Sequence, residues 1–342
     1  MDRPLALSVL DQAPAPAGTT PDAALREVVE LARAAEAWRY RRYWIAEHHN
    51  TPSLAATAPE VAVAAVAAAT SSIRVGSGGV LLPYYSPLKV AEVFRSLDAL
   101  FPGRIDLGIG RAAGTDPAAE AALLASGGAS GEERFAENLV ELLSFLEEDA
   151  VAAAAADEVR AMPSGGGGPE VWLLGSSSYS SACAAYLGLP LAFAHFITPA
   201  HGPQIVESYR RGFRGGAGAA PRALIAVGAL CAESDEEAER QAGTADLWRL
   251  GPEGAPRRPI LPPEEVAAHQ WTDLQRERAS QARAGVIAGS PERVRARLVS
   301  LAEEFAVDEV MVVTVCHDLA ARRRSYELLA EAFGLRPPQP IG

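Results

Sequence analysis

Two adjacent histidines, His48 and His49, follow an acidic residue, Glu47, at the end of a short apolar run. Consecutive strand residues point to opposite faces, and the sequence has no HExxH or HxH spacing, so we expect no metal here. One histidine could instead act as an acid, a base or a hydrogen-bond donor, because its pKa lies near neutral. Alternatively, both histidines cap a strand and bind loop carbonyls.

A second segment, residues 73–83, carries three glycines inside an apolar, β-branched run: Gly76, Gly78 and Gly79. Glycine weakens a strand because it loses the most conformational entropy on folding. Its use here indicates a bulge, or the close approach of another group to the backbone. A flat ring lying against the Gly78–Gly79 peptide would explain the pattern, and so would a packing bulge without a ligand.

Two further segments could bind an anion. Arg111 follows the apolar run 105–110, and a guanidinium can hold a phosphate through two hydrogen bonds. Ser176, Ser177 and Ser180 precede an alanine-rich stretch, where hydroxyls and backbone N–H groups at a helix start form an anion site. The alternatives are a surface salt bridge for Arg111 and ordinary helix capping for the serines. A lone histidine, His195, could face the same site, although such residues are more often part of the core.

These segments lie on a regular framework. Short apolar, β-branched runs alternate with longer alanine-rich runs of helical period. A strand followed by a helix, repeated eight times, predicts an α/β protein with a (β/α)8 TIM barrel, whose active site forms at the C-terminal ends of the strands. The predicted strands are residues 5–10, 42–46, 73–80, 105–110, 171–175, 191–196, 224–231 and 309–315.

The helices carry signals of their own. A capping side chain stands before a proline at four predicted helix starts: Thr20, Ser86, Asp116 and Ser290. One predicted helix has a clear apolar stripe at helical spacing: Val294, Leu298, Leu301 and Phe305.

The predicted domain is a single barrel over residues 1–342, with one excursion. Residues 251–281 follow the seventh strand and are rich in proline and charge, with Trp248 just before them and Trp271 among them. Such excursions in barrels often shape the active site. We therefore expect an insertion near the barrel mouth.

The composition limits the classes of partner that the protein can bind. The formal net charge is −12, which argues against nucleic acid and anionic membrane surfaces but leaves room for one local phosphate site. No apolar run approaches the ~20 residues that a membrane span needs. The three cysteines are scattered without zinc spacing, which fits a reduced, cytoplasmic setting.

In order and spacing, the segments resemble the luciferase-like monooxygenases, which include the bacterial alkanal monooxygenase subunits. The similarity covers nearly the whole chain and is greatest to the family's single-chain bacterial oxidoreductases. The motifs that carry it are W-x-x-E-H-H at 44–49, V-G-S-G-G-V-L-L-P at 75–83, G-R-I-D-L-G-I-G-R at 103–111, R-A-A-G-T-D at 111–116 and the serine run from 176.

The resemblance implies a cofactor, reduced FMN, with O2 as co-substrate. Arg111, Ser180 and the backbone near Ser176 and Ser177 would hold the FMN phosphate. The flavin ring would lie against the Gly78–Gly79 peptide, which is a cis bond in relatives.

The resemblance also assigns catalytic residues: His48 matches the family's catalytic histidine and Glu47 its preceding acid. It implies a two-component monooxygenase, in which a separate NAD(P)H:flavin reductase supplies reduced flavin and a flavin C4a-hydroperoxide oxygenates a small organic substrate. A homodimer through the helix at 59–69 is implied as well. Gly110 stands where the luciferase has a reactive cysteine, and Phe196 where many relatives have a second histidine.

Three alternatives remain open. A sister branch of the same superfamily uses the deazaflavin F420 for hydride transfer. A barrel hydrolase could use Glu47 and Asp106 as paired carboxylates. The chain could also be a non-catalytic flavin-binding protein or partner subunit.

Overall fold

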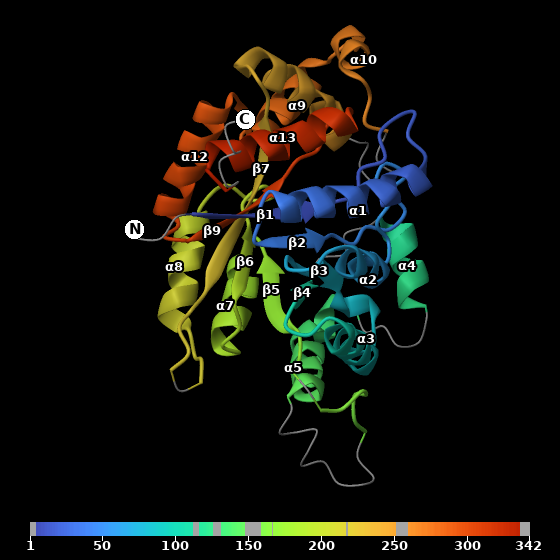
Figure 1. Ribbon diagram of the computed structural model, residues 1–342, viewed down its shortest axis with the longest axis vertical. Coiled ribbons are helices and arrows are strands. Elements are labelled where there is room, and N and C mark those ends of the chain that lie inside the picture. The colour runs from blue at the N-terminus through green and yellow to red at the C-terminus, as the bar shows by residue number, and fades with distance from the viewer. Residues whose placement is uncertain are drawn as a thin grey trace, which may run out of the picture.

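The computed structural model describes residues 5–111, 116–125, 131–147, 159–165, 167–216, 218–250 and 259–335. It confirms the predicted (β/α)8 barrel: eight parallel strands close on themselves, and helices pack around them (Figure 1). Around the barrel the strands follow chain order from β1 to β7 and then β9, which pairs back with β1. This closure brings strand ends that are distant in sequence to one mouth.

The eight predicted strands are all present, with ends within two residues of those expected. The ninth, β8, was not predicted; it pairs with β7 beyond the barrel wall and has only four residues, too few for a clear alternation. The strands are β1 (Ala6–Asp11), β2 (Arg42–Ile45), β3 (Arg74–Leu81), β4 (Ile105–Gly110), β5 (Glu170–Gly175), β6 (Leu191–Ala194), β7 (Ala223–Cys231), β8 (Val286–Gly289) and β9 (Glu309–Val313).

The α-helices form the outer layer and connect the strands. They are α1 (Pro21–Ala37), α2 (Pro59–Ala69), α3 (Pro87–Leu100), α4 (Pro117–Leu124), α5 (Phe135–Leu146), α7 (Ser178–Tyr186), α8 (Gly202–Gly212), α9 (Asp235–Arg249), α10 (Pro263–Ala268), α11 (Asp273–Arg283), α12 (Pro291–Glu304) and α13 (Leu319–Ala332). Within the described ranges, no helix is both long and apolar enough to cross a membrane.

The four predicted helix starts are at the correct positions, but only two of them have the predicted side-chain cap. Proline opens the helix at all four sites, and Thr20 and Asp116 accept the expected backbone hydrogen bonds. Ser86 and Ser290 make no such bond, so their predicted capping is wrong. Proline's fixed φ already favours the first turn, so these two starts form without a side-chain cap. The apolar stripe of α12 is buried, as predicted.

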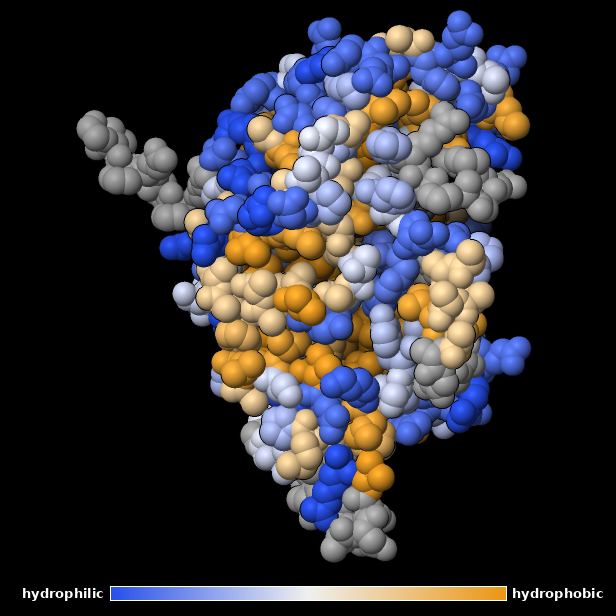
Figure 2. Space-filling view, turned by 90° about the vertical axis from the view of Figure 1, so that its right-hand side faces the viewer, coloured by the Kyte–Doolittle hydropathy of each residue, from blue (hydrophilic) through white to orange (hydrophobic). Residues whose placement is uncertain are grey.

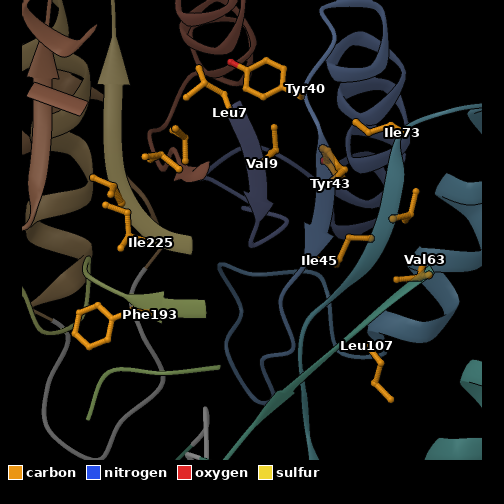
Figure 3. Close-up of a cluster of buried hydrophobic side chains, with 14 of the residues drawn as sticks. Leu7, Val9, Tyr40, Tyr43, Ile45, Val63, Ile73, Leu107, Phe193 and Ile225 are labelled. Carbon is orange, nitrogen blue, oxygen red and sulfur yellow. The ribbon is translucent and has the colours of Figure 1, made fainter. Parts of the chain in front are cut away.

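Strand side chains alternate between two cores. On β2, Tyr43 and Ile45 point into the layer between strands and helices, whereas Trp44 points into the barrel. Figure 3 shows the outer layer, with Val9, Tyr43 and Ile45 on β1 and β2 beside the helices. The inner residues therefore determine what the barrel interior holds.

A charged cluster closes the N-terminal end of the barrel interior. Arg42 donates to Asp106 Oδ2 at 2.9 Å and to Glu309 Oε1 at 2.7 Å. The indole N–H of Trp44 donates to the same Asp106 oxygen at 2.8 Å, and Arg74 binds the other one. Burial raises the pKa of Asp106, and both arginines oppose that rise. This cluster, together with Trp44, forms a closed base beneath the mouth.

The excursion after β7 contains more than a loop. The predicted insertion, residues 251–281, includes α10 and α11, while residues 251–258 lie outside the described residues. Ile260 accepts a backbone hydrogen bond from Ala17 at 3.0 Å, which joins this segment to the loop after β1.

Candidate active site

A cavity of about 740 Å³ opens where the barrel strands end. Figure 2 faces the side on which α4 lies and shows a recess with apolar side chains in it. A cavity of this size falls within the range of sites for small organic ligands. All residues predicted for the site line it: Glu47, His48, Gly78, Gly79, Arg111, Ser176, Ser177 and Ser180. The barrel thus brings four distant segments together.

The two adjacent histidines have different surroundings. His48 lines the cavity. The ring of His49 packs edge-on against Tyr84, with its Nε2 atom 2.7 Å from Glu47 Oε1. The described residues contain no group of three or more His, Cys, Asp or Glu side chains that could hold a metal.

Glu47 is almost fully buried, and both of its oxygens have partners. Besides His49, Oε1 accepts from the hydroxyl of Tyr85 at 2.6 Å, and Oε2 accepts from the backbone N–H of Leu81 at 2.9 Å. Burial and the nearby Glu47 carboxylate raise the pKa of Tyr85, so its hydroxyl stays a donor at neutral pH. Glu47 therefore ties the segment that carries His48 to the end of β3.

The peptide bond between Gly78 and Gly79 is cis. The pairing of β3 with β4 shifts register at this point, which is the bulge that the glycines indicated. A Cβ atom on Gly78 would lie 2.6 Å from a Leu10 methyl, and one on Gly79 would lie 2.6 Å from the Gly108 carbonyl oxygen. The backbone of β4 thus requires glycine at position 79, whereas a side chain at position 78 would force Leu10 to move, and both glycines face the cavity.

Arg111 stands just past β4, at the cavity edge. Its guanidinium lies 4.6 Å from the ring centroid of Tyr179, and its Nε atom is 3.7 Å from Glu132 Oε2. A separation of 3.7 Å is too long for a hydrogen bond. The side chain is 34% exposed, so its donors can reach a further acceptor. Residues 112–115 of the predicted R-A-A-G-T-D motif lie outside the described residues.

The first turn of α7 borders the same cavity. Ser177 is the N-cap residue, yet its side chain makes no capping bond, so the alternative of ordinary helix capping does not apply to this serine. The side chain of Ser180 is buried against Gly175, where an added Cβ would lie 2.3 Å from that of the serine. The helix start therefore approaches the strand closely and presents N–H groups without a side-chain cap, which suits an anion.

Two candidate residues lie elsewhere. His195 packs edge-on against Phe305, 5.5 Å away, outside the cavity wall. Burial lowers its pKa, and the residue belongs to the core, as the more common alternative predicted. Asp106 is fully buried in the charged cluster beneath Trp44. The proposed carboxylate pair of Glu47 and Asp106 is therefore wrong, because the two side chains serve different ends of the barrel.

We did not predict Gln12, Trp248 or Arg249 as site residues, yet all three line the cavity. The indole N–H of Trp248 donates to Ser53 Oγ at 2.7 Å, across 195 residues of chain. A contact between such distant segments leaves no local pattern. The sequence feature that pointed to this part of the wall was the neighbouring proline-rich excursion, residues 251–281.

The family model of luciferase-like monooxygenases matches residues 5–309. The chain belongs to the luciferase-like monooxygenase family. Among its relatives is a luciferase-like monooxygenase of Escherichia coli, 37% identical, with 96% of each chain covered. Another is the N-acetyl-S-alkylcysteine monooxygenase of Bacillus subtilis, 33% identical over 95% of this chain and 97% of the relative. This family member is therefore an enzyme of the monooxygenase type.

Solved structures share the fold of the chain. The chain is similar to the crystal structure of apo-MsnO8, with 42% identity, a TM-score of 0.87 and coverage of 97% and 99% of the two chains. The oxygenating constituent of a diketocamphane monooxygenase in complex with FMN shares the fold at 19% identity and a TM-score of 0.70. An F420-dependent secondary alcohol dehydrogenase shares it at 14% and 0.62. These last two likenesses concern the fold alone.

Proposed function

We propose that this luciferase-like monooxygenase uses reduced FMN and O2 to oxygenate a small organic substrate. The observation that carries the proposal is the convergence of His48, the Gly78–Gly79 peptide, Arg111 and the start of α7 on one cavity. A relative of 33% identity is a monooxygenase of N-acetyl-S-alkylcysteines, which supports a small organic substrate.

The residues of the mouth fit FMN. The uncapped N-terminus of α7 and the guanidinium of Arg111 both offer donors to a phosphate. Ser176, Ser177 and Ser180 line the same part of the wall, and Gly78 and Gly79 present a surface without side chains to a flat ring. When bound, reduced FMN supplies the activation of dioxygen, and the protein supplies binding, orientation and exclusion of water.

The chain's own residues then divide the work. His48 faces the cavity and would donate a hydrogen bond and move a proton to or from the reacting oxygen. We assign Glu47 to positioning, because its oxygens are occupied by Tyr85, His49 and the backbone of Leu81. This assignment revises the sequence-based expectation that Glu47 takes part directly in catalysis.

Direct titration tests the cofactor. FMN and F420 are each added to the wild-type protein, and binding is followed by fluorescence. We expect the tighter dissociation constant for FMN. Tighter binding of F420 would replace the oxygenase by the hydride-transfer alternative.

We infer that reduced FMN comes from a separate NAD(P)H:flavin reductase and that the enzyme acts in the cytoplasm, where its free cysteines remain reduced. Oxygen consumption with NADH and FMN should therefore require added reductase. Equal consumption without the reductase would contradict a two-component system.

We also propose that the protein forms a homodimer with α2 in the interface. Apart from Glu60, all residues of α2 are apolar, and Val61 on its outer side is 66% exposed. Figure 2 shows apolar side chains gathered on this side of the molecule. Light scattering should give a dimer for the wild type and a monomer for Val61→Asp, whereas Val140→Asp on the exposed face of α5 should remain dimeric. A monomeric wild type would reject the dimer.

A further inference from the structure

The first turn of α7 carries an aromatic residue among its serines. Tyr179 is the second residue of the helix, between Ser178 and Ser180, and its side chain is exposed. It is not among the residues that line the cavity, whereas Arg111, Ser177 and Ser180 are. Tyr179 therefore borders the proposed phosphate site without being part of the cavity wall.

The ring of Tyr179 contacts Arg111 directly. The guanidinium carbon of Arg111 lies over the ring, 4.6 Å from its centroid. The same guanidinium has its Nε atom 3.7 Å from Glu132 Oε2, which is too far for a hydrogen bond. Among the described residues, no oxygen accepts a hydrogen bond from this guanidinium. A cation and a ring attract each other without an acceptor oxygen, so Tyr179 restrains the side chain and leaves its N–H donors for a ligand.

Such a restraint favours binding because an arginine side chain is flexible. An arginine that becomes ordered only when its ligand arrives loses rotamer freedom at that moment, which weakens the complex. Tyr179 belongs to the same helix turn whose uncapped N–H groups suit an anion. The ring therefore holds the guanidinium, which comes from the end of β4, close to the N-terminus of α7, which follows β5.

We propose that Tyr179 is a positioning residue, which holds Arg111 in place for the phosphate of FMN through the contact between ring and guanidinium. The inference rests on the proposed function and deepens it. The hydroxyl of Tyr179 plays no part in this contact: burial and the neighbouring Cys183 thiol raise the pKa of Tyr179, so the phenol stays uncharged. Because the ring alone attracts the cation, phenylalanine can replace tyrosine at this position.

The test compares FMN with riboflavin, which has the same ring system and ribityl chain but no phosphate. Flavin fluorescence gives both dissociation constants, and the preference for FMN over riboflavin reports on contacts to the phosphate. Tyr179→Leu should reduce this preference about threefold, as the loss of one exposed cation–π contact does. Tyr179→Phe should retain most of it. Tyr186→Leu is the matched control and should retain all of it, because this exposed tyrosine of the same helix contacts Arg214, 5.0 Å from its ring centroid.

A double-mutant cycle decides whether the ring acts through Arg111. Tyr179→Leu should cause no further loss of the preference in the Arg111→Gln background. It should cause the full loss in the Arg211→Gln background, where a charge is removed from the exposed face of α8. A further loss in Arg111→Gln would show that Tyr179 acts through the helix and not through Arg111, and would overturn the proposal. An unchanged preference in Tyr179→Leu would overturn it as well.

The titration with FMN and F420 separates this inference from the proposed function. If the wild type binds F420 more tightly than FMN, the oxygenase proposal fails. The same variants are then measured with F420 and with its phosphate-free chromophore, and the preference between these two decides the role of Tyr179 in the same way. Equal affinities of the wild type for the phosphorylated and phosphate-free forms would overturn the inference alone, and the oxygen reaction of the reduced flavin would still test the oxygenase.

Discussion

Arg42 and Arg111 stand at opposite ends of one barrel, and their surroundings differ. Arg42 is buried, stacks 4.8 Å from the ring centroid of Trp172, and holds three carboxylates at 2.7 to 3.1 Å. Arg111 is a third exposed and reaches Glu132 only at 3.7 Å. Arg42 therefore serves structure, because protein carboxylates use its donors, whereas Arg111 is the arginine that we propose binds a ligand.

The largest effect expected from this contrast concerns stability. Arg42→Met removes the buried cation that Asp106, Glu309 and Glu170 share, so we expect a loss of about 3–5 kcal/mol in the free energy of unfolding. Urea denaturation measures it. Arg26→Met, which breaks an exposed pair with Asp22, should change stability by less than about 0.5 kcal/mol. Similar losses of stability in both variants would contradict the distinction between the buried and the exposed arginine.

At the mouth, His48→Ala should change chemistry and leave stability nearly unaltered. We expect turnover to fall about a hundredfold, the lower range for loss of an acid or base, while the dissociation constant of FMN stays within twofold. Single-turnover kinetics with a substrate that the wild type oxygenates, together with FMN titration, provide both numbers. Unchanged turnover would refute the role of His48.

Arg111→Gln should weaken FMN binding about tenfold, because it removes a charge-assisted contact to phosphate. Flavin fluorescence measures the dissociation constant, and Arg211→Gln serves as the control. An affinity equal to that of the wild type would exclude Arg111 from the phosphate site.

The smallest expected effect concerns Glu170, which pairs with Arg42 in the charged cluster. Burial raises the pKa of Glu170, but hydrogen bonds from Trp172 and Arg222 and the charge of Arg42 outweigh it and lower the pKa from 4.5 to about 2. A depressed folded-state pKa contributes stability that is present above pH 4.5 and lost as pH falls toward 2. The stability difference between wild type and Glu170→Gln should therefore narrow over that range. A constant difference would contradict the assignment.

Periodicity was sufficient to predict the barrel, since each strand of the wall is a separate apolar run with its own boundary. β8 was not predicted, because its four residues, V-I-A-G, are too few to show the alternation of apolar and polar side chains. His48, Arg111 and the glycine segment were recognisable because strand ends in a barrel converge on one mouth. Trp248 and Arg249 were not, since they lie at the end of α9, and the contact of Trp248 with Ser53 is one that no local pattern encodes. The hydrogen-bond partners of Glu47 could be identified only from the structure. Because of them we propose a positioning role for Glu47 and not a catalytic one.

The most direct test of the flavin assignment is the oxygen reaction of reduced FMN in the presence of the protein. Wild-type protein and reduced FMN are mixed without oxygen, oxygenated buffer is added, and the flavin absorbance is followed by stopped flow. We expect a reoxidation phase that is slower than that of free reduced FMN and is altered in His48→Ala. A trace identical to that of free flavin would contradict it.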